Sequence, residues 1–117
     1  MEIRPRTIHY YVTRDGRVAF REWYSKLADM DAKVVIRTRL TRVERGLLGD
    51  FKPIGDGVFE LRLFMGPGYQ VYLGMKDRVM VILLCGGDKG RQNKNIRTAK
   101  KYWEDYLRRS QHENTEL

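Results

Sequence analysis

Apolar residues near the start of the chain follow first the spacing of a strand and then that of a helix. The run IHYYV (8–12) is β-branched and aromatic and is followed by the turn residues TRDG, which is typical of a strand that ends in a turn. Between residues 18 and 27 the large apolar side chains recur at steps of three and four. These are Phe20, Trp23, Tyr24 and Leu27. The pattern predicts a first strand and then a first helix.

A longer amphipathic segment, DMDAKVVIRTRLTRVERGLLGD, predicts a second helix. Asp29 and Asp31 are both suitable N-caps, because a short carboxylate accepts a hydrogen bond from the backbone of the first turn. Gly46 and Gly49 are both candidate stop positions. The apolar residues between them step by four, three and four: Ile36, Leu40, Val43 and Leu47. This periodicity outweighs the weaker helix propensity of the β-branched residues near its start.

The middle of the chain contains three short apolar runs, 58–65, 69–75 and 78–85, separated by GPG and KD, and this predicts an antiparallel meander. In the first run Phe59, Leu61, Leu63 and Met65 share one face. The other face carries Glu60 and Arg62 and is mixed, so we expect it to be partly exposed. The third run, VMVILLC, is apolar on both faces and predicts a central strand.

The segments on either side of the meander predict a connection and a final helix. GDFKPIGDG indicates a helix-to-strand connection with extended backbone at residues 52–54. After the meander one helix face carries Ile96, Ala99, Trp103 and Leu107. Tyr102, Trp103 and Tyr106 are assigned to the core, because aromatic residues at helical spacing are more often core than base-stacking residues. Residues 110–117 are expected to form a flexible tail.

Together these elements predict an α+β fold, with an N-terminal strand, two helices, an antiparallel sheet and a C-terminal helix. We expect the helices to pack on one side of the sheet and residues 1–109 to form a single domain. The chain of 117 residues is long enough to bury a core of its own.

Positive charge is the main compositional feature. The 23 Lys and Arg residues exceed the 15 Asp and Glu residues, which gives a net charge of +8. Residues 89–101 include six basic residues and no acidic one. Such a surface attracts a polyanion or an acidic protein. On the final helix, however, Arg97, Lys100 and Lys101 are also consistent with an ordinary solvated face.

Cysteine usage and hydropathy indicate a cytoplasmic protein. Cys85 is the single cysteine and lies in an apolar run, which is typical of a reducing compartment. The first ten residues lack the apolar stretch of a signal peptide, and no window approaches the ~18 apolar residues of a membrane span. Two histidines and one cysteine do not suit the usual zinc or iron sites, so we expect no metal or cofactor.

The predicted sheet carries a candidate polar cluster. Glu60 and Arg62 stand two residues apart, so their side chains project to the same face about 7 Å apart along the strand. They either meet a ligand or form an ordinary cross-strand ion pair. Gln70 and Tyr72 share a phase on the next strand. The sequence does not determine which strand faces align.

The stretch VILLCGGDKGRQNKN changes from apolar to basic at two glycines. Gly86 and Gly87 are predicted to end the strand, so that Lys89 and Arg91 project over the sheet edge. Lys89 and Arg91, together with Lys94 and the backbone N–H groups at the start of the final helix, form a candidate phosphate-binding rim. The alternative is a glycine-rich turn with solvated charges. GGDKG lacks the spacing and the Lys-Ser/Thr ending of a Walker loop, which excludes that mode of nucleoside triphosphate binding.

Neither histidine is well placed to act as a base, because His9 lies in the first strand and His112 lies in the tail. Acid and base chemistry would therefore fall to Lys, Glu, Tyr or Arg. Such residues can cleave RNA if the 2′-hydroxyl is held in line with the phosphate and cations stabilise the developing charge.

The ordered series GVFELR, GPGYQVY and LLCGGDK resembles the RelE/ParE superfamily of bacterial type II toxins, in its HigB-like branch. The resemblance extends over nearly the whole chain, from RDGRVAFREWYSKL to VILLCGGDKGRQNKNIRTAKKYW. It implies a toxin that, in RelE-like members, binds the ribosomal A site and cleaves messenger RNA through 2′-hydroxyl attack. It also implies that Arg62 and Lys89 contact phosphate. The chain departs from many relatives at Gln70, where they carry arginine, and in having no tyrosine soon after Lys89.

Three hypotheses follow. The first is a ribosome-dependent mRNA endonuclease with Arg62 and Lys89 as transition-state stabilisers, Glu60 as proton acceptor, and Arg91, Gln70 and Lys94 as RNA-binding residues. The second is a ParE-like toxin that inhibits DNA gyrase without cutting RNA. The third is an inactive basic RNA-binding module. For either toxin we expect a neutralising helix-turn-helix antitoxin as partner.

Overall fold

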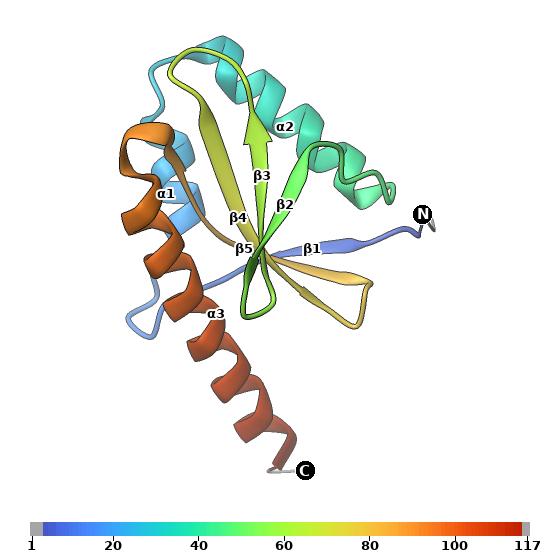
Figure 1. Ribbon diagram of the computed structural model, residues 1–117. Coiled ribbons are helices and arrows are strands. Elements are labelled where there is room, and N and C mark those ends of the chain that lie inside the picture. Colours follow the sequence, from blue (N-terminus) through green and yellow to red (C-terminus); the bar gives the residue numbers. More distant parts are fainter. Residues whose placement is uncertain (1–3, 116–117) are drawn as a thin grey trace.

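The computed structural model describes the backbone of residues 4–115 and the side chains of residues 4–110 (Figure 1). The elements in chain order are β1 (Thr7–Tyr10), α1 (Ala19–Lys26), α2 (Met30–Glu44), β2 (Phe51–Gly55), β3 (Val58–Leu63), β4 (Tyr69–Lys76), β5 (Met80–Asp88), a 3₁₀ turn (Lys89–Arg91) and α3 (Gln92–Thr115). The α+β class and the central meander are confirmed. No helix in the described part of the chain is both long and apolar enough to cross a membrane.

The five strands form one sheet in the order β1-β5-β4-β3-β2. β2 to β5 pair as antiparallel neighbours, whereas β1 pairs with β5 in parallel. The sheet is therefore mixed, and the prediction of an antiparallel sheet is wrong at this edge. The GDFKPIGDG connection includes an additional strand, because Phe51 and Lys52 of β2 pair with Leu61 and Glu60 of β3.

Helices cover both faces of the sheet (Figure 1). One face packs against α1 and α2 through Phe20, Ile36, Val43, Leu61, Leu63, Val71, Leu73, Val81 and Leu83. The other packs against α3 through Val58, Tyr72, Ile82, Leu84, Cys85, Ala99 and Trp103. The prediction that all helices lie on one side is wrong. The reason is the two-sided apolar pattern of β5, which requires a cover on each face.

The ends of α2 follow directly from its sequence. The Asp29 side chain accepts a hydrogen bond from the Ala32 N–H at 3.0 Å, which makes it the N-cap. At the other end Gly46 has a positive φ of 93°, and the N–H groups of Gly46 and Leu47 bond to the carbonyls of Val43 and Arg42. This is a Schellman motif, so Gly46 is the stop residue.

The final helix is longer than predicted. Trp103 is buried, and Tyr102 and Tyr106 pack beside it, which confirms their assignment to the core. The helix then continues to Thr115, beyond the predicted boundary at residue 109. Residues 116 and 117 of the predicted tail lie outside the described part of the chain.

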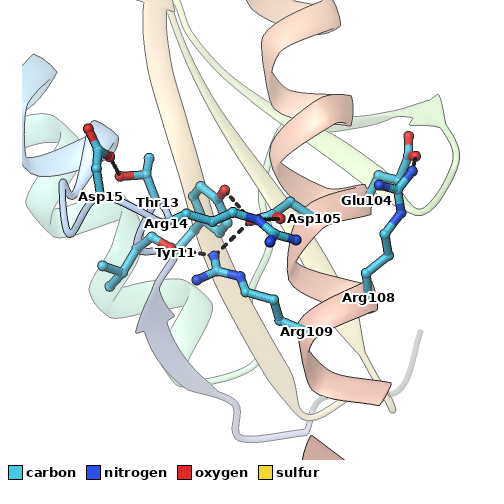
Figure 2. Close-up of polar contacts among 9 residues, drawn as sticks. Tyr11, Thr13, Arg14, Asp15, Glu104, Asp105, Arg108 and Arg109 are labelled. Carbon is cyan, nitrogen blue, oxygen red and sulfur yellow. Dashed lines mark hydrogen bonds and ion pairs between the residues drawn. The ribbon is translucent and has the colours of Figure 1, made fainter. Parts of the chain in front are cut away.

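Figure 2 shows a polar cluster that joins α3 to the segment after β1. The buried Tyr11 hydroxyl donates to Asp105 Oδ2 at 2.7 Å, and Arg14 Nε donates to Asp105 Oδ1 at 2.8 Å. Arg109 Nη2 lies 2.8 Å from Asp105 Oδ2. Burial alone would raise the pKa of this carboxyl, but the hydrogen bonds and positive charges of its partners outweigh burial and lower it. The carboxylate therefore stays charged and holds the helix in place.

Replacing Asp105 by alanine should lower the free energy of unfolding by about 1–3 kcal/mol, because the buried Tyr11 hydroxyl loses its acceptor. Glu104→Ala is the matched control. It removes an exposed pair with Arg108 on the same helix (Figure 2) and should cost less than about 1 kcal/mol. Thermal unfolding of both variants measures the difference, and equal losses would contradict this role of Asp105.

Candidate functional site

A pocket of about 510 Å³ opens where the β3–β4 loop meets the start of α3. Its lining comprises Arg62 and Leu63 at the end of β3, the loop residues 64–68, Tyr69 and Gln70 at the start of β4, and Lys89 and Gln92 beyond β5. Arg62 and Lys89 are 27 positions apart in the chain, and the fold brings them to one pocket.

The register between β3 and β4 brings four polar side chains together, and we call them the polar floor of the site. Arg62 lies opposite Gln70 and Glu60 lies opposite Tyr72. Because alternate residues of a strand share a face, all four side chains belong to the α3 side of the sheet. This confirms the polar cluster whose alignment the sequence left open.

Arg62 is half-buried and pairs with Asp50, so the ion pair with Glu60, one of the two alternatives that the sequence left open, does not form. Its Nη2 donates instead to Asp50 Oδ1 at 3.0 Å, and both side chains are 38% exposed. A pair this accessible stabilises the fold little. Its Nε atom is buried and has no hydrogen-bond partner. Arg62 is thus held loosely enough to turn toward a ligand.

Glu60 lies beneath the pocket and is not part of its lining. It is only 1% exposed, and its Oε2 accepts hydrogen bonds from the Tyr72 hydroxyl at 3.0 Å and from Gln92 Nε2 at 2.9 Å. Burial, and then the charge and hydrogen bond of Glu60, raise the pKa of Tyr72 and keep the phenol protonated. The predicted role of Glu60 as a direct proton acceptor does not fit this position. Its geometry is that of a residue that fixes Gln92 and Tyr72.

Gly86 and Gly87 do not end the strand, as the sequence predicted, because β5 continues through both of them to Asp88. A Cβ on Gly86 would lie 2.2 Å from the Trp23 ring, and one on Gly87 would lie 1.9 Å from Asn95 Nδ2. The two glycines therefore permit close packing of α1 and α3 on the strand. The extended strand carries Lys89 to the pocket, where its N–H donates to the Gly68 carbonyl at 3.0 Å.

The predicted basic rim is present and exposed. Lys89, Arg91 and Lys94 are solvent-accessible and line a second, more open pocket of about 400 Å³, which shares Lys89 and Gln92 with the first. The helix start is less available to an anion than predicted, since the Asp88 carboxylate already accepts the Gly90 N–H at 3.0 Å. The rim therefore attracts anions chiefly through its side chains.

Two further residues matter to the site and were not predicted. Arg39 of α2 donates to the carbonyls of Leu48, Asp50 and Arg62, so it ties the loop before β2 to β3 and keeps Asp50 beside Arg62. Burial lowers its pKa. Phe64 is 82% exposed at the rim of the pocket. Its signal in the sequence is a large aromatic residue in the same phase as the polar positions 60 and 62.

The remaining predictions concern histidine and metal. His9 is exposed on the edge strand β1 and does not line the pocket, and the side chain of His112 lies outside the described part. Among the described residues no group of three or more His, Cys, Asp or Glu side chains is arranged to hold a metal ion.

Glu60→Ala should lower the free energy of unfolding by at least about 2 kcal/mol, because the buried Tyr72 hydroxyl and the part-buried Gln92 amide lose their common acceptor. Asp50→Ala removes the accessible partner of Arg62 and serves as the control, with an expected loss below about 1 kcal/mol. Urea unfolding compares the two. If the Asp50 variant were the less stable one, Glu60 would not be the residue that fixes the floor of the pocket.

Comparison with known proteins identifies one relative of this chain. An uncharacterized protein of Haemophilus influenzae is 49% identical over 83 residues, which cover 71% of this chain and 84% of that protein. No family model matches the chain, and no solved structure matches it. At this identity and coverage, the chain belongs to the same family as the Haemophilus influenzae protein.

Proposed function

We propose that this protein is the toxin of a type II toxin–antitoxin system and acts in the cytoplasm as a ribosome-dependent mRNA endonuclease. The observation that carries the proposal is the convergence of Arg62 and Lys89 on one pocket. The three sequence motifs that resemble the RelE/ParE superfamily each contribute to it: GVFELR supplies Arg62, GPGYQVY supplies the β3–β4 loop and Gln70, and LLCGGDK supplies Lys89.

The chemistry suits a site with cations and no histidine base in its lining. In RNA cleavage of this type, the 2′-hydroxyl gives its proton to water and its oxygen forms a bond to phosphorus, while the bond from phosphorus to the 5′-oxygen breaks and that oxygen takes up a proton from water. Negative charge develops on the phosphoryl oxygens, and Arg62 and Lys89 stabilise it from the pocket. Arg91 and Lys94 hold the RNA strand along the adjoining rim. Glu60 acts from below as a positioning residue through Gln92.

A translating extract that receives the purified protein should accumulate new mRNA 5′ ends, which primer extension detects. Arg62→Ala/Lys89→Ala should cut at least ~100-fold more slowly, because removing stabilisers of transition-state charge commonly costs this much. Arg37→Ala/Lys101→Ala is the matched control, since it removes two exposed cations that do not line the pocket. It should cut at nearly the wild-type rate.

Unchanged mRNA 5′ ends would reject the endonuclease, and a fully active double variant would reject the site. The second candidate is a gyrase inhibitor, which is favoured by the neutral Gln70 where many RelE-like relatives carry a cation. A DNA supercoiling assay separates the two, because the endonuclease should leave supercoiling unchanged. A protein that does neither and is harmless when expressed would be an inactive RNA-binding module.

We expect a small helix-turn-helix antitoxin, encoded beside this gene, to cover the basic pocket. Affinity purification from native cells should recover it at a submicromolar dissociation constant, and its expression should release growth arrest. The Arg62→Ala/Lys89→Ala variant should bind it more weakly than the Arg37→Ala/Lys101→Ala control, since charge complementarity guides such contacts. Recovery of no neighbour-encoded protein would contradict this expectation.

A further inference from the structure

Two buried polar atoms at the pocket have no hydrogen-bond partner. Within the described side chains four buried side-chain nitrogen or oxygen atoms are unpartnered, and Gln70 Oε1 is the one acceptor among them. Arg62 Nε is another member of this set. Gln70 and Arg62 are direct cross-strand partners, so the residue with the unused acceptor and the residue with the unused donor occupy neighbouring positions in the wall of one pocket.

This arrangement is unfavourable in the free protein. Buried polar groups are normally paired, and an unpaired one retains the full cost of its desolvation. Gln70 is only 6% exposed, and its Oε1 atom is buried. The Arg62 side chain makes one accessible ion pair, with Asp50, and otherwise lies against the exposed ring of Phe64. A small rotation of Arg62 therefore opens the Gln70 amide to a ligand that offers a donor beside an acceptor.

Phe64 supplies the third part of the site. Its side chain is 82% exposed on the β3–β4 loop, and the Arg62 guanidinium carbon lies 5.9 Å from the centre of its ring. An exposed aromatic ring beside a cation is the usual platform for an unpaired base, which stacks on the ring while the cation neutralises phosphate.

We propose that the pocket binds one unpaired ribonucleotide and reads the Watson–Crick edge of its base. The base stacks on Phe64, and its edge donates to Gln70 Oε1 and accepts from Arg62 Nε. The remaining N–H groups of the Arg62 guanidinium and the Lys89 ammonium bind the adjacent phosphates. Each of the four bases presents a donor next to an acceptor on that edge, and base pairing occupies the same atoms. The site thus selects single-stranded over paired RNA, with Gln70 as the selecting residue. The inference rests on the proposed function in taking RNA as the substrate.

The test uses two labelled decaribonucleotides, one of uridine and one of 3-methyluridine, and measures binding by fluorescence anisotropy. The methyl group removes the ring donor but keeps the stacking surface and every phosphate. Wild-type protein should bind the uridine strand about tenfold more tightly, the value expected of one hydrogen bond to a neutral acceptor. Gln70→Leu should bind both strands alike, and Phe64→Ala should bind both more weakly.

Thermal unfolding distinguishes a binding role of Gln70 from a structural one. Because Gln70→Leu replaces an unpaired amide by an apolar group of similar size, the melting temperature should stay the same or rise. A large fall would show that the amide has a partner in the free protein and would overturn the inference. The inference would also be overturned if the wild-type protein bound the two strands equally or bound neither, and this result needs no variant.

The outcome is separable from that of the proposed function. If the protein prefers the uridine strand through Gln70 but leaves mRNA intact, the binding site is supported and the endonuclease is rejected. Cleavage of mRNA at an equal rate by wild-type and Gln70→Leu proteins, with no preference between the strands, would keep the endonuclease and reject this role of Gln70.

Discussion

The buried carboxylate of Glu60 links the sheet to the start of α3, and the site depends on that link. Glu60 accepts one hydrogen bond from Tyr72 on the neighbouring strand and one from Gln92 in the first turn of the helix. A polar group buried this deeply is stable only when its hydrogen-bond partners are in place. The register of β3 and β4 and the position of the helix start are therefore fixed together, and with them the approach of Lys89 to Arg62.

The basic side chains around the polar floor fall into two groups, those that stabilise the fold and those that are exposed to solvent. Arg39 is occupied with backbone carbonyls and serves the fold, whereas Lys89, Arg91 and Lys94 extend into solvent. Arg62 is intermediate, with one accessible contact and one unused donor. Positive charge at this pocket is thus divided between side chains that build the site and side chains that remain available to an anion.

Local periodicity predicted the helices and the meander well, because α1, α2 and α3 each carry an apolar face of regular spacing. It failed where a tertiary contact overrides a local preference. Gly86 and Gly87 suggested a strand end, since glycine weakens a strand, but the missing side chains make room for Trp23 and Asn95. The parallel pairing of β1 with β5 is a long-range contact that no local pattern encodes. The opposition of Arg62 to Gln70 depends on the turn between β3 and β4, which the alternation of residues along each strand does not specify. Phe64 follows the end of β3 in the phase of Glu60 and Arg62, so the sequence does mark it as an apolar residue on the polar side of this strand.

The central claim is that Arg62 and Lys89 grip the backbone of one RNA strand together. Its most direct test is the salt dependence of binding to a single-stranded oligoribonucleotide, measured for the wild-type protein and for a variant that lacks both cations. Each phosphate contact contributes roughly 0.7 to the slope of log affinity against log salt for a single strand, so the variant's slope should be smaller by about 1.4. An unchanged slope would show that the two side chains do not contact the RNA backbone and would contradict the account.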